Sequence, residues 1–114
     1  MHINYALTTL NLRKNSFGYE GAKKIAEMLG NGSNVLQNLN ISENFIQDEG
    51  GQLIAIAIAT ASRLKTIDMR DTDIRDETAK ELAQTLKRNK SVKCLNIESN
   101  MVSLNYYELI QQTM

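Results

Sequence analysis

The sequence predicts an α/β fold, a right-handed solenoid of four βα repeats with parallel strands on its concave face and helices on its convex face. The first observation is one apolar pattern that recurs four times. Its copies begin at Leu7, Leu36, Leu64 and Val92, so they are 29, 28 and 28 residues apart. A fixed period of this length is typical of units that contact mainly their neighbours. The second observation is that each copy changes from a spacing of two residues to helical spacing.

Each strand is predicted from positions 1, 4 and 6 of its unit, counted from the first residue of the pattern. These positions hold only apolar residues: Leu7, Leu10, Leu12; Leu36, Leu39, Ile41; Leu64, Ile67, Met69; and Val92, Leu95, Ile97. Apolar residues two apart indicate a short strand with one buried face. Parallel neighbours need a long crossover between them, and a helix supplies it.

Four helices are predicted at residues 20–29, 49–61, 77–87 and 104–112. Positions 19 and 23 form the apolar stripe that faces the strands: Ile25, Ile54, Leu82 and Ile110, then Leu29, Ile58, Leu86 and Met114. Acidic residues at positions 13 and 14 favour the positive end of the helix dipole: Asp48, Asp76, Glu20, Glu49 and Glu77. Small residues follow them, as in Gly50-Gly51, and predict a close approach to the preceding loop. The stretch 53–59 alternates like a strand, but its register in the repeat predicts a helix.

The pattern resembles the leucine-rich repeat, and its length resembles the subclass of the ribonuclease inhibitor. The resemblance spans roughly residues 7 to 112, within a single domain of residues 1–114. In that family the Asn at position 9 closes the turn after the strand by bonding loop backbone groups of adjacent units. This implies structural roles for Asn15, Asn44 and Asn100. Thr72 stands at this position in the third unit, where we expect the loosest turn.

Composition narrows the classes of partner. Lys plus Arg and Asp plus Glu number 13 each, so an overall basic surface for nucleic acid is not expected. The run from Lys87 to Lys90 is short and typical of a solvated turn. The single cysteine, Cys94, excludes an internal disulfide and favours a reducing, cytoplasmic setting. The longest apolar stretch, 53–61, is about half of the roughly 20 residues that a membrane span requires, so no membrane partner is expected.

Catalytic and cofactor sites are not predicted. His2 is the only histidine, so neither a zinc ligand set nor a histidine base for Cys94 is available. The stretch 30–33 contains two glycines but lacks the Lys and hydroxyl of a phosphate-binding loop, and it follows a helix instead of preceding one. We therefore expect a protein that is not an enzyme and that holds no cofactor or metal.

Two surfaces are candidates for binding a protein partner. On the concave face, Arg13 and Arg70 are the residues of the type that anchors interfaces. Glu98 lies one strand from Arg70, where it either pairs with this arginine or contacts a partner. On the convex face, Leu53 and Ile56 place apolar bulk where other units carry polar groups. This is either ordinary scattered surface hydrophobicity or a docking patch.

The two ends of the array depart from the repeat. Tyr106 and Tyr107 replace small residues, and they either cover the open end or contact a partner. The first strand begins within six residues of Met1, which leaves one flank of the first unit uncovered. We expect either a fragment of a longer array, or a subunit that is docked in a larger assembly or self-associates through its uncapped ends.

The stretch from Ala79 to Asn100 is similar to the repeat region of tropomodulins, and axonemal and ciliary repeat proteins have a similar texture. The activator of the Ran GTPase has this repeat too, although its loop arginine and acidic tail have no matching residues here. The leading prediction is a non-enzymatic protein–protein interaction or scaffold module in a cytoskeletal or axonemal setting. One alternative is a GTPase-activating repeat protein, with Arg13 or Arg70 as the charge stabiliser. The other is tropomodulin-like binding of actin filaments.

Overall fold

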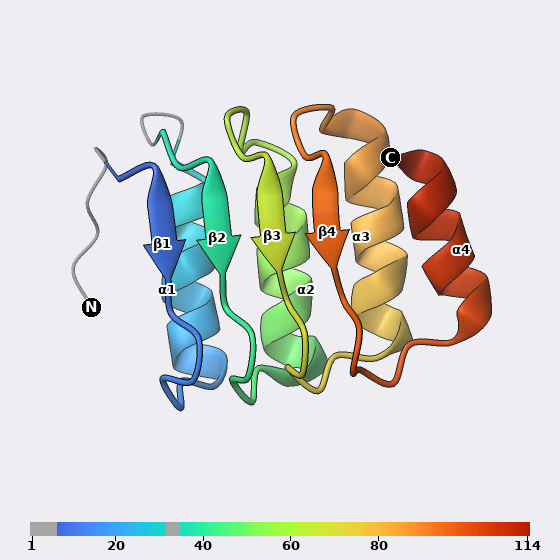
Figure 1. The fold of residues 1–114 in the computed structure, drawn as a ribbon, viewed down its shortest axis with the longest axis horizontal. Helices are drawn as coiled ribbons and strands as arrows, with labels where there is room; N and C mark the ends of the chain where they lie inside the picture. Colours follow the sequence, from blue (N-terminus) through green and yellow to red (C-terminus); the bar gives the residue numbers. More distant parts are fainter. Residues whose placement is uncertain (1–6, 32–34) are drawn as a thin grey trace.

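The computed structural model describes residues 7–31 and 35–114, in which strands and helices alternate. Its elements are β1 (Thr9–Asn11), α1 (Tyr19–Leu29), β2 (Asn38–Asn40), α2 (Gln47–Ile58), β3 (Thr66–Asp68), α3 (Asp76–Arg88), β4 (Cys94–Asn96) and α4 (Leu104–Thr113). Figure 1 shows two layers, with the strands side by side on one and the helices on the other. The α/β solenoid of four repeats is confirmed.

The sheet is parallel, in the order β1-β2-β3-β4. Residues one period apart are paired, so Leu10 lies opposite Leu39, Leu39 opposite Ile67, and Ile67 opposite Leu95. The shared register places position 4 of every unit on the buried face. All amino-terminal ends of the strands therefore lie along one edge of the sheet, and all carboxyl-terminal ends lie along the other (Figure 1).

The core is the continuous apolar spine that the repeat predicts. Ile25, Ile54 and Leu82 are fully buried, and Ile110 is 1% exposed. Burying four such side chains contributes about 2 kcal/mol each by the transfer scale. Met114 was expected in the same core but is 40% exposed. It follows the last turn of α4, and no further helix lies beside it in the described residues.

The terminal units are less well covered than the central ones. Leu10 and Leu12 are half-buried, whereas Leu39 and Ile41 of the next unit are buried. The reason is that β1 has a neighbouring strand on one side only. At the other end, Tyr106 and Tyr107 are half-buried against the core cluster, as the covering interpretation predicts.

Small residues allow the helices to approach the preceding loops closely, as predicted. A Cβ added at Gly50 would lie 2.6 Å from a methyl of Ile46 and 2.8 Å from Cβ of Ala22. One added at Gly51 would lie 2.5 Å from the hydroxyl of Thr78. All three distances are below ordinary van der Waals contact, so these positions have no room for a side chain.

Helix boundaries differ from the sequence-based ones mainly at α2, which ends at Ile58 instead of residue 61. Its chain continues through i→i−3 bonds, such as Ala61 N–H to the Ile58 carbonyl at 3.1 Å, which turn it toward β3. Asp48 lies in the first turn of α2, as predicted, and has a second role as well. Its carboxylate accepts bonds from the backbone of Arg75 (2.8 Å) and from the Thr78 hydroxyl (2.6 Å), and so caps α3 of the next unit.

Candidate functional site

The loops that follow the strands are shaped by asparagines of the next unit. The Asn44 amide donates to the carbonyls of Leu12 (2.8 Å) and Ile41 (3.0 Å), and its oxygen accepts from Asn15 N–H (2.8 Å). Asn100 does the same for the third unit, donating to the Met69 carbonyl at 2.9 Å. The structural role that the resemblance implied is therefore observed for these two residues.

Asn15 is different from the other two asparagines. It is exposed, and its amide donates only to the Arg13 carbonyl at 3.1 Å within its own unit. In the described residues no earlier repeat lies beside it. Its side chain therefore forms no bond to another unit, unlike the series of position-9 asparagines Asn44 and Asn100, which we call the asparagine ladder.

Thr72 interrupts the ladder. Its hydroxyl donates to the Met69 carbonyl at 2.9 Å and reaches no backbone group of the second unit. The loosest turn was predicted in the third unit, but the loop of that unit is held by Asn100, which accepts bonds from Thr72 and Ile74 N–H. The loop of the second unit is the one that lacks an asparagine from its neighbour, and its conformation differs from those of the first and third units. There the N–H groups of Ile46 and Gln47 bond to the Thr72 carbonyl at 3.1 and 2.9 Å.

The backbone angle φ at position 10 differs between the units. Ser16 and Asp73 adopt φ of 54° and 57°, a left-handed conformation that small polar residues tolerate. Phe45 and Met101 occupy the same position in the other two units and have no positive φ, while Gln47 takes φ of 62°. Large apolar residues are disfavoured in that region. Phe45 and Met101 instead project from the loops, where they are 65% and 68% exposed.

Phe45 and Met101 line the same hollow, of about 400 Å³, at the carboxyl-terminal edge of the sheet. Its remaining lining is polar or acidic: Glu43, Asn44, Asp71, Asp73, Ser99 and Asn100. We call this the Phe45–Met101 hollow. Neither Phe45 nor Met101 was predicted as a site residue. The sequence feature that could have indicated them is a bulky apolar residue at position 10, where the other two units have Ser16 and Asp73.

On the concave face, position 5 has a structural role. Asn11, Asn40, Asp68 and Asn96 each accept a bond, at 3.0–3.1 Å, from the N–H two residues later. Such local bonds occupy backbone N–H groups that a neighbouring strand could otherwise use. Position 3 forms a lateral chain in which Thr66 donates to Asn38 (2.7 Å) and Asn38 donates to Thr9 (3.3 Å).

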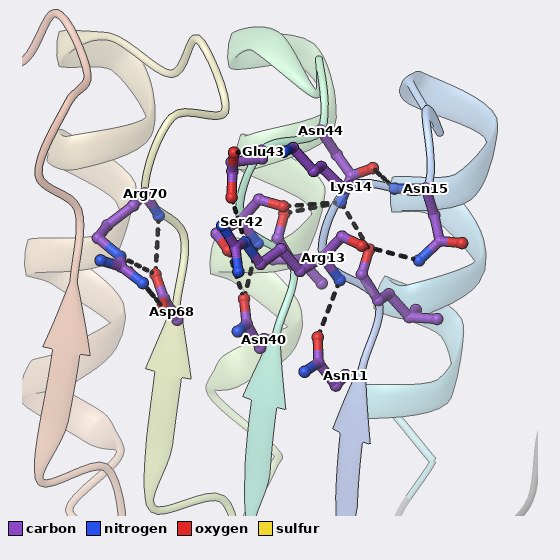
Figure 2. A network of polar contacts seen from close by, with 12 residues as sticks. Asn11, Arg13, Lys14, Asn15, Asn40, Ser42, Glu43, Asn44, Asp68 and Arg70 are labelled. Atoms are coloured by element: carbon purple, nitrogen blue, oxygen red, sulfur yellow. Dashed lines mark hydrogen bonds and ion pairs between the residues drawn. The ribbon is translucent and has the colours of Figure 1, made fainter.

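The two predicted arginine anchors are already paired within the protein, as Figure 2 shows. Arg13 forms an ion pair with Glu43 of the next unit, and its hydrogen bond lowers the pKa of that carboxyl. Arg70, two residues after β3, forms an ion pair with Asp68 at the end of that strand (2.8 Å), and the hydrogen bonds between them raise the pKa of the guanidinium. Pairing of Arg70 with Glu98 was one of two open expectations, and the structure pairs Arg70 with Asp68 instead. Glu98 is exposed.

Arg13 and Arg70 nevertheless line one hollow together with Ser42. It shares Glu43, Asp71 and Ser99 with the Phe45–Met101 hollow. The two hollows are therefore adjacent. The structure thus joins the predicted arginines to the two apolar side chains that were not predicted.

On the convex face, the two predicted apolar residues differ in exposure. Ile56 is 54% exposed, whereas Leu53 is half-buried. On α2, therefore, Ile56 protrudes into solvent and Leu53 is partly covered.

Groups for catalysis or metal binding are sparse. Cys94 is free and exposed at the start of β4. Among the residues that the structure describes, no group of His, Cys, Asp and Glu is placed to hold a metal ion. His2, Gly32 and Ser33 lie outside the described residues. Of the described helices, none has both the length and the apolar character needed to cross a membrane.

Comparisons with known proteins agree with this architecture. The model of the Leucine Rich repeat family matches residues 6–26 and 32–55. NACHT, LRR and PYD domains-containing protein 13 of Homo sapiens is 35% identical over 94 residues, which are 82% of this chain and 9% of that protein. RAN GTPase-activating protein 2 of Arabidopsis thaliana is 35% identical over 98 residues, 85% of this chain and 18% of that protein. The chain thus spans less than a fifth of either relative.

Among solved structures, Leiomodin-1 Actin-Binding Site 2 superposes with a TM-score of 0.80 at 14% identity. The match covers 96% of this chain and 65% of that one. At this identity the likeness concerns the fold alone. The repeated pattern, the parallel strands with their crossover helices and the bonds of Asn44 and Asn100 lead to one conclusion: the chain belongs to the leucine-rich-repeat family.

Proposed function

We propose that this protein is a non-enzymatic protein–protein interaction module that binds its partner at the Phe45–Met101 hollow. The observation that carries the proposal is the exposure of Phe45 and Met101, 65% and 68%, on two loops that border one hollow. Aromatic residues and Met are enriched at protein interfaces. Both side chains lie in water here, so covering them with a partner is favourable.

The charges around the hollow indicate the chemistry of the partner. Asp71 and Asp73 line the hollow, and the ion pair between Asp73 and Arg75 is long, at 3.5 Å. A protein segment that presents an apolar side chain beside a Lys or Arg would satisfy both features. The apolar group would cover Phe45 and Met101, and the cation would approach the carboxylates.

Arg13, Arg70 and Glu98 extend this proposed surface along the concave face. The two arginines are half-exposed, and their pairing with Glu43 and Asp68 fixes their guanidinium groups at one place. Such pre-organisation lowers the entropy lost when a partner binds. Leu53 and Ile56 form a separate proposed contact on the convex face, where Ile56 is the protruding side chain.

A capture experiment with three matched proteins tests the proposal. The wild type, the double variant Phe45→Ser/Met101→Ser and the single variant Ile56→Glu are immobilised, and bound proteins are quantified by mass spectrometry. We expect a defined set of proteins to be lost only with the double variant. All substituted side chains are exposed, so folding should be little affected, and circular dichroism checks this. Equal capture by the wild type and the double variant would contradict the proposal, and loss confined to Ile56→Glu would move the site to the convex face.

A regulatory GTPase-activating role is the second candidate. It is supported by the 35% identity to RAN GTPase-activating protein 2 over 85% of this chain. Arg13 or Arg70 would stabilise the charge that develops on the transferred phosphoryl group, and each would first have to leave its carboxylate partner. GTP hydrolysis by a small GTPase is measured with the wild type, Arg13→Ala and Arg70→Ala. A rate increase that disappears with one variant would establish this role, and equal rates in all samples would refute it.

A cytoskeletal setting, with actin as a partner, is also proposed. The supporting likeness is to the fold of Leiomodin-1 Actin-Binding Site 2, together with the tropomodulin-like stretch 79–100. The free thiol of Cys94 agrees with a reducing cytoplasm. Cosedimentation with actin filaments tests the idea directly. Pelleting that does not rise with filament concentration would remove actin from the candidates.

Two finer assignments complete the proposal. The complete α-helix in each unit of 28 or 29 residues supports the ribonuclease-inhibitor-like subclass. The half-buried side chains of Leu10, in β1, and Leu12, just after it, support docking of another repeat or subunit against β1. Sedimentation equilibrium at increasing protein concentration reveals self-association there. A Leu10→Glu variant that associates as strongly as the wild type would exclude docking against β1.

A further inference from the structure

Positive charge is concentrated at the amino-terminal edge of the sheet, opposite the Phe45–Met101 hollow. Arg63, Lys65 and Lys93 line a second hollow there, together with Gln37, Ser62 and Ser91. None of the described residues that line it is a carboxylate. We call this hollow, together with the neighbouring segments 59–65 and 87–93, the basic edge.

The last two residues of α3 and two neighbouring connections, from α2 to β3 and from α3 to β4, build the basic edge. Segments 59–65 and 87–93 together contain six cations and no acid: Arg63, Lys65, Lys87, Arg88, Lys90 and Lys93. The run from Lys87 to Lys90 was expected to be a solvated turn, and its three cations are exposed, the first two at the end of α3. The fold places this run beside a second basic loop that lies more than twenty residues earlier in the sequence.

The two connections are tied firmly together. The Asn89 side chain is buried and donates to the carbonyls of Ile58 (2.7 Å) and Ala61 (3.2 Å). It also accepts a bond from Val92 N–H at 3.0 Å. Lys93 N–H donates to the Lys65 carbonyl at 2.8 Å, so the two lysines start from adjacent backbone positions. The cations are therefore presented on a rigid base, which favours binding.

The charges of the basic edge are not neutralised within the protein. In the ranges 7–31 and 35–114, the ion pairs involve Arg13, Lys14, Arg70 and Arg75, all near the carboxyl-terminal edge. None of the six cations of the basic edge takes part in one. Like charges on neighbouring segments repel one another, and a bound anion would relieve that repulsion. The chain is neutral overall, so this local excess arises only from the fold.

We propose that the basic edge is a second interaction surface, which binds an acidic segment of a partner protein. Four of the six cations are lysines, which act as separate point charges and suit several spaced carboxylates. None of the described residues that line the hollow is aromatic, so they form no platform for stacking nucleic-acid bases. Its apolar neighbours Leu64 and Val92 are buried, so nothing inserts into a lipid layer. A carboxylate-rich peptide fits these features best.

Fluorescence anisotropy with a labelled ten-residue glutamate peptide tests this proposal. The matched variants are Lys65→Glu/Lys93→Glu at the basic edge and Lys23→Glu/Lys24→Glu on α1, where both lysines are exposed. Both pairs change the net charge equally. We expect the first pair to weaken binding by about tenfold or more and the second by less than about threefold. Binding should also weaken as salt is added, because these charges are exposed to solvent.

Several results would overturn the proposal. They are absence of peptide binding at low ionic strength, equal weakening by the two variant pairs, or equal binding of a neutral Gly/Ser peptide. Inorganic phosphate, single-stranded oligothymidylate and phosphatidylserine vesicles are compared in parallel. Tighter binding of any of these than of the glutamate peptide, lost with Lys65→Glu/Lys93→Glu, would assign the edge to that ligand instead of a protein. Because none of these residues borders the Phe45–Met101 hollow, the outcome is independent of the function proposed above.

Discussion

Replacing Asn44 by alanine tests how much a ladder asparagine contributes to stability, and Asn15→Ala is its natural control. Both residues occupy position 9 of their units. Asn44 is 2% exposed and bonds backbone groups of two units, whereas Asn15 is exposed and bonds one carbonyl of its own unit. The same atoms are removed in both variants, so only the surroundings differ.

The magnitude follows from the bonds that are lost. The Asn44 amide donates to three carbonyls, those of Leu12, Ile41 and Ser42, at 2.8, 3.0 and 3.1 Å. Its oxygen accepts from Asn15 N–H at 2.8 Å and from Phe17 N–H at 3.4 Å. Each well-formed bond contributes about 0.5–1.5 kcal/mol net. The amide has two N–H groups, which the three carbonyls share, so two donated bonds and the short accepted bond are counted. We therefore expect a loss of about 3 kcal/mol for Asn44→Ala and under about 0.5 kcal/mol for Asn15→Ala.

Urea unfolding followed by far-ultraviolet circular dichroism measures the difference, since the chain has no tryptophan. A domain of this size has a free energy of unfolding of about 5–15 kcal/mol, so the expected loss is a large fraction of the total. The dependence on urea should keep its slope if unfolding remains a single transition. If Asn44→Ala is no less stable than Asn15→Ala, the ladder does not hold the units together and the reasoning is refuted.

Three further predictions use the same assay. Thr72→Asn should stabilise the protein by about 1 kcal/mol and slow amide exchange at Ile46, because an amide there would complete the ladder; faster exchange at Ile46 would contradict this. Gly51→Ala should destabilise by about 1–3 kcal/mol because its Cβ has no room, while Gly18→Ala, whose nearest neighbour would be 3.5 Å away, should change stability by less than about 0.5 kcal/mol. The Arg13 hydrogen bond keeps the pKa of Glu43 below its ordinary value of 4.5 in the folded state. Its contribution is therefore present at neutral pH and is lost as pH falls below 4.5, so Glu43→Gln should flatten the acid limb of the stability profile, and an unchanged limb would refute the pairing.

The fold was predictable from the sequence because the repeat register outweighs local patterns. Residues 53–59 alternate as a strand would, yet Ile54 and Ile58 take the helical stripe positions and are fully buried in α2. In a solenoid, each unit must match the apolar surface of its neighbours. One ambiguous segment is thus assigned by the units on either side.

The surfaces were less predictable, because they depend on contacts between units. The exposure of Phe45 follows from a loop conformation that accompanies Thr72, a residue 27 positions later. The choice of Asp68 as the partner of Arg70 depends on side-chain geometry that spacing alone does not give. The basic edge likewise arises only when Lys65 and Lys93 become neighbours.

Nuclear Overhauser effects between the methyl groups of Ile25, Ile54, Leu82 and Ile110 test the central claim most directly. If equivalent side chains of successive units stack, cross-peaks should join each of these residues to the next one, and none should join Ile25 to Leu82. Cross-peaks that skip a unit, or no contact between Ile54 and its two neighbours in the series, would contradict the stacked arrangement on which both proposed surfaces depend.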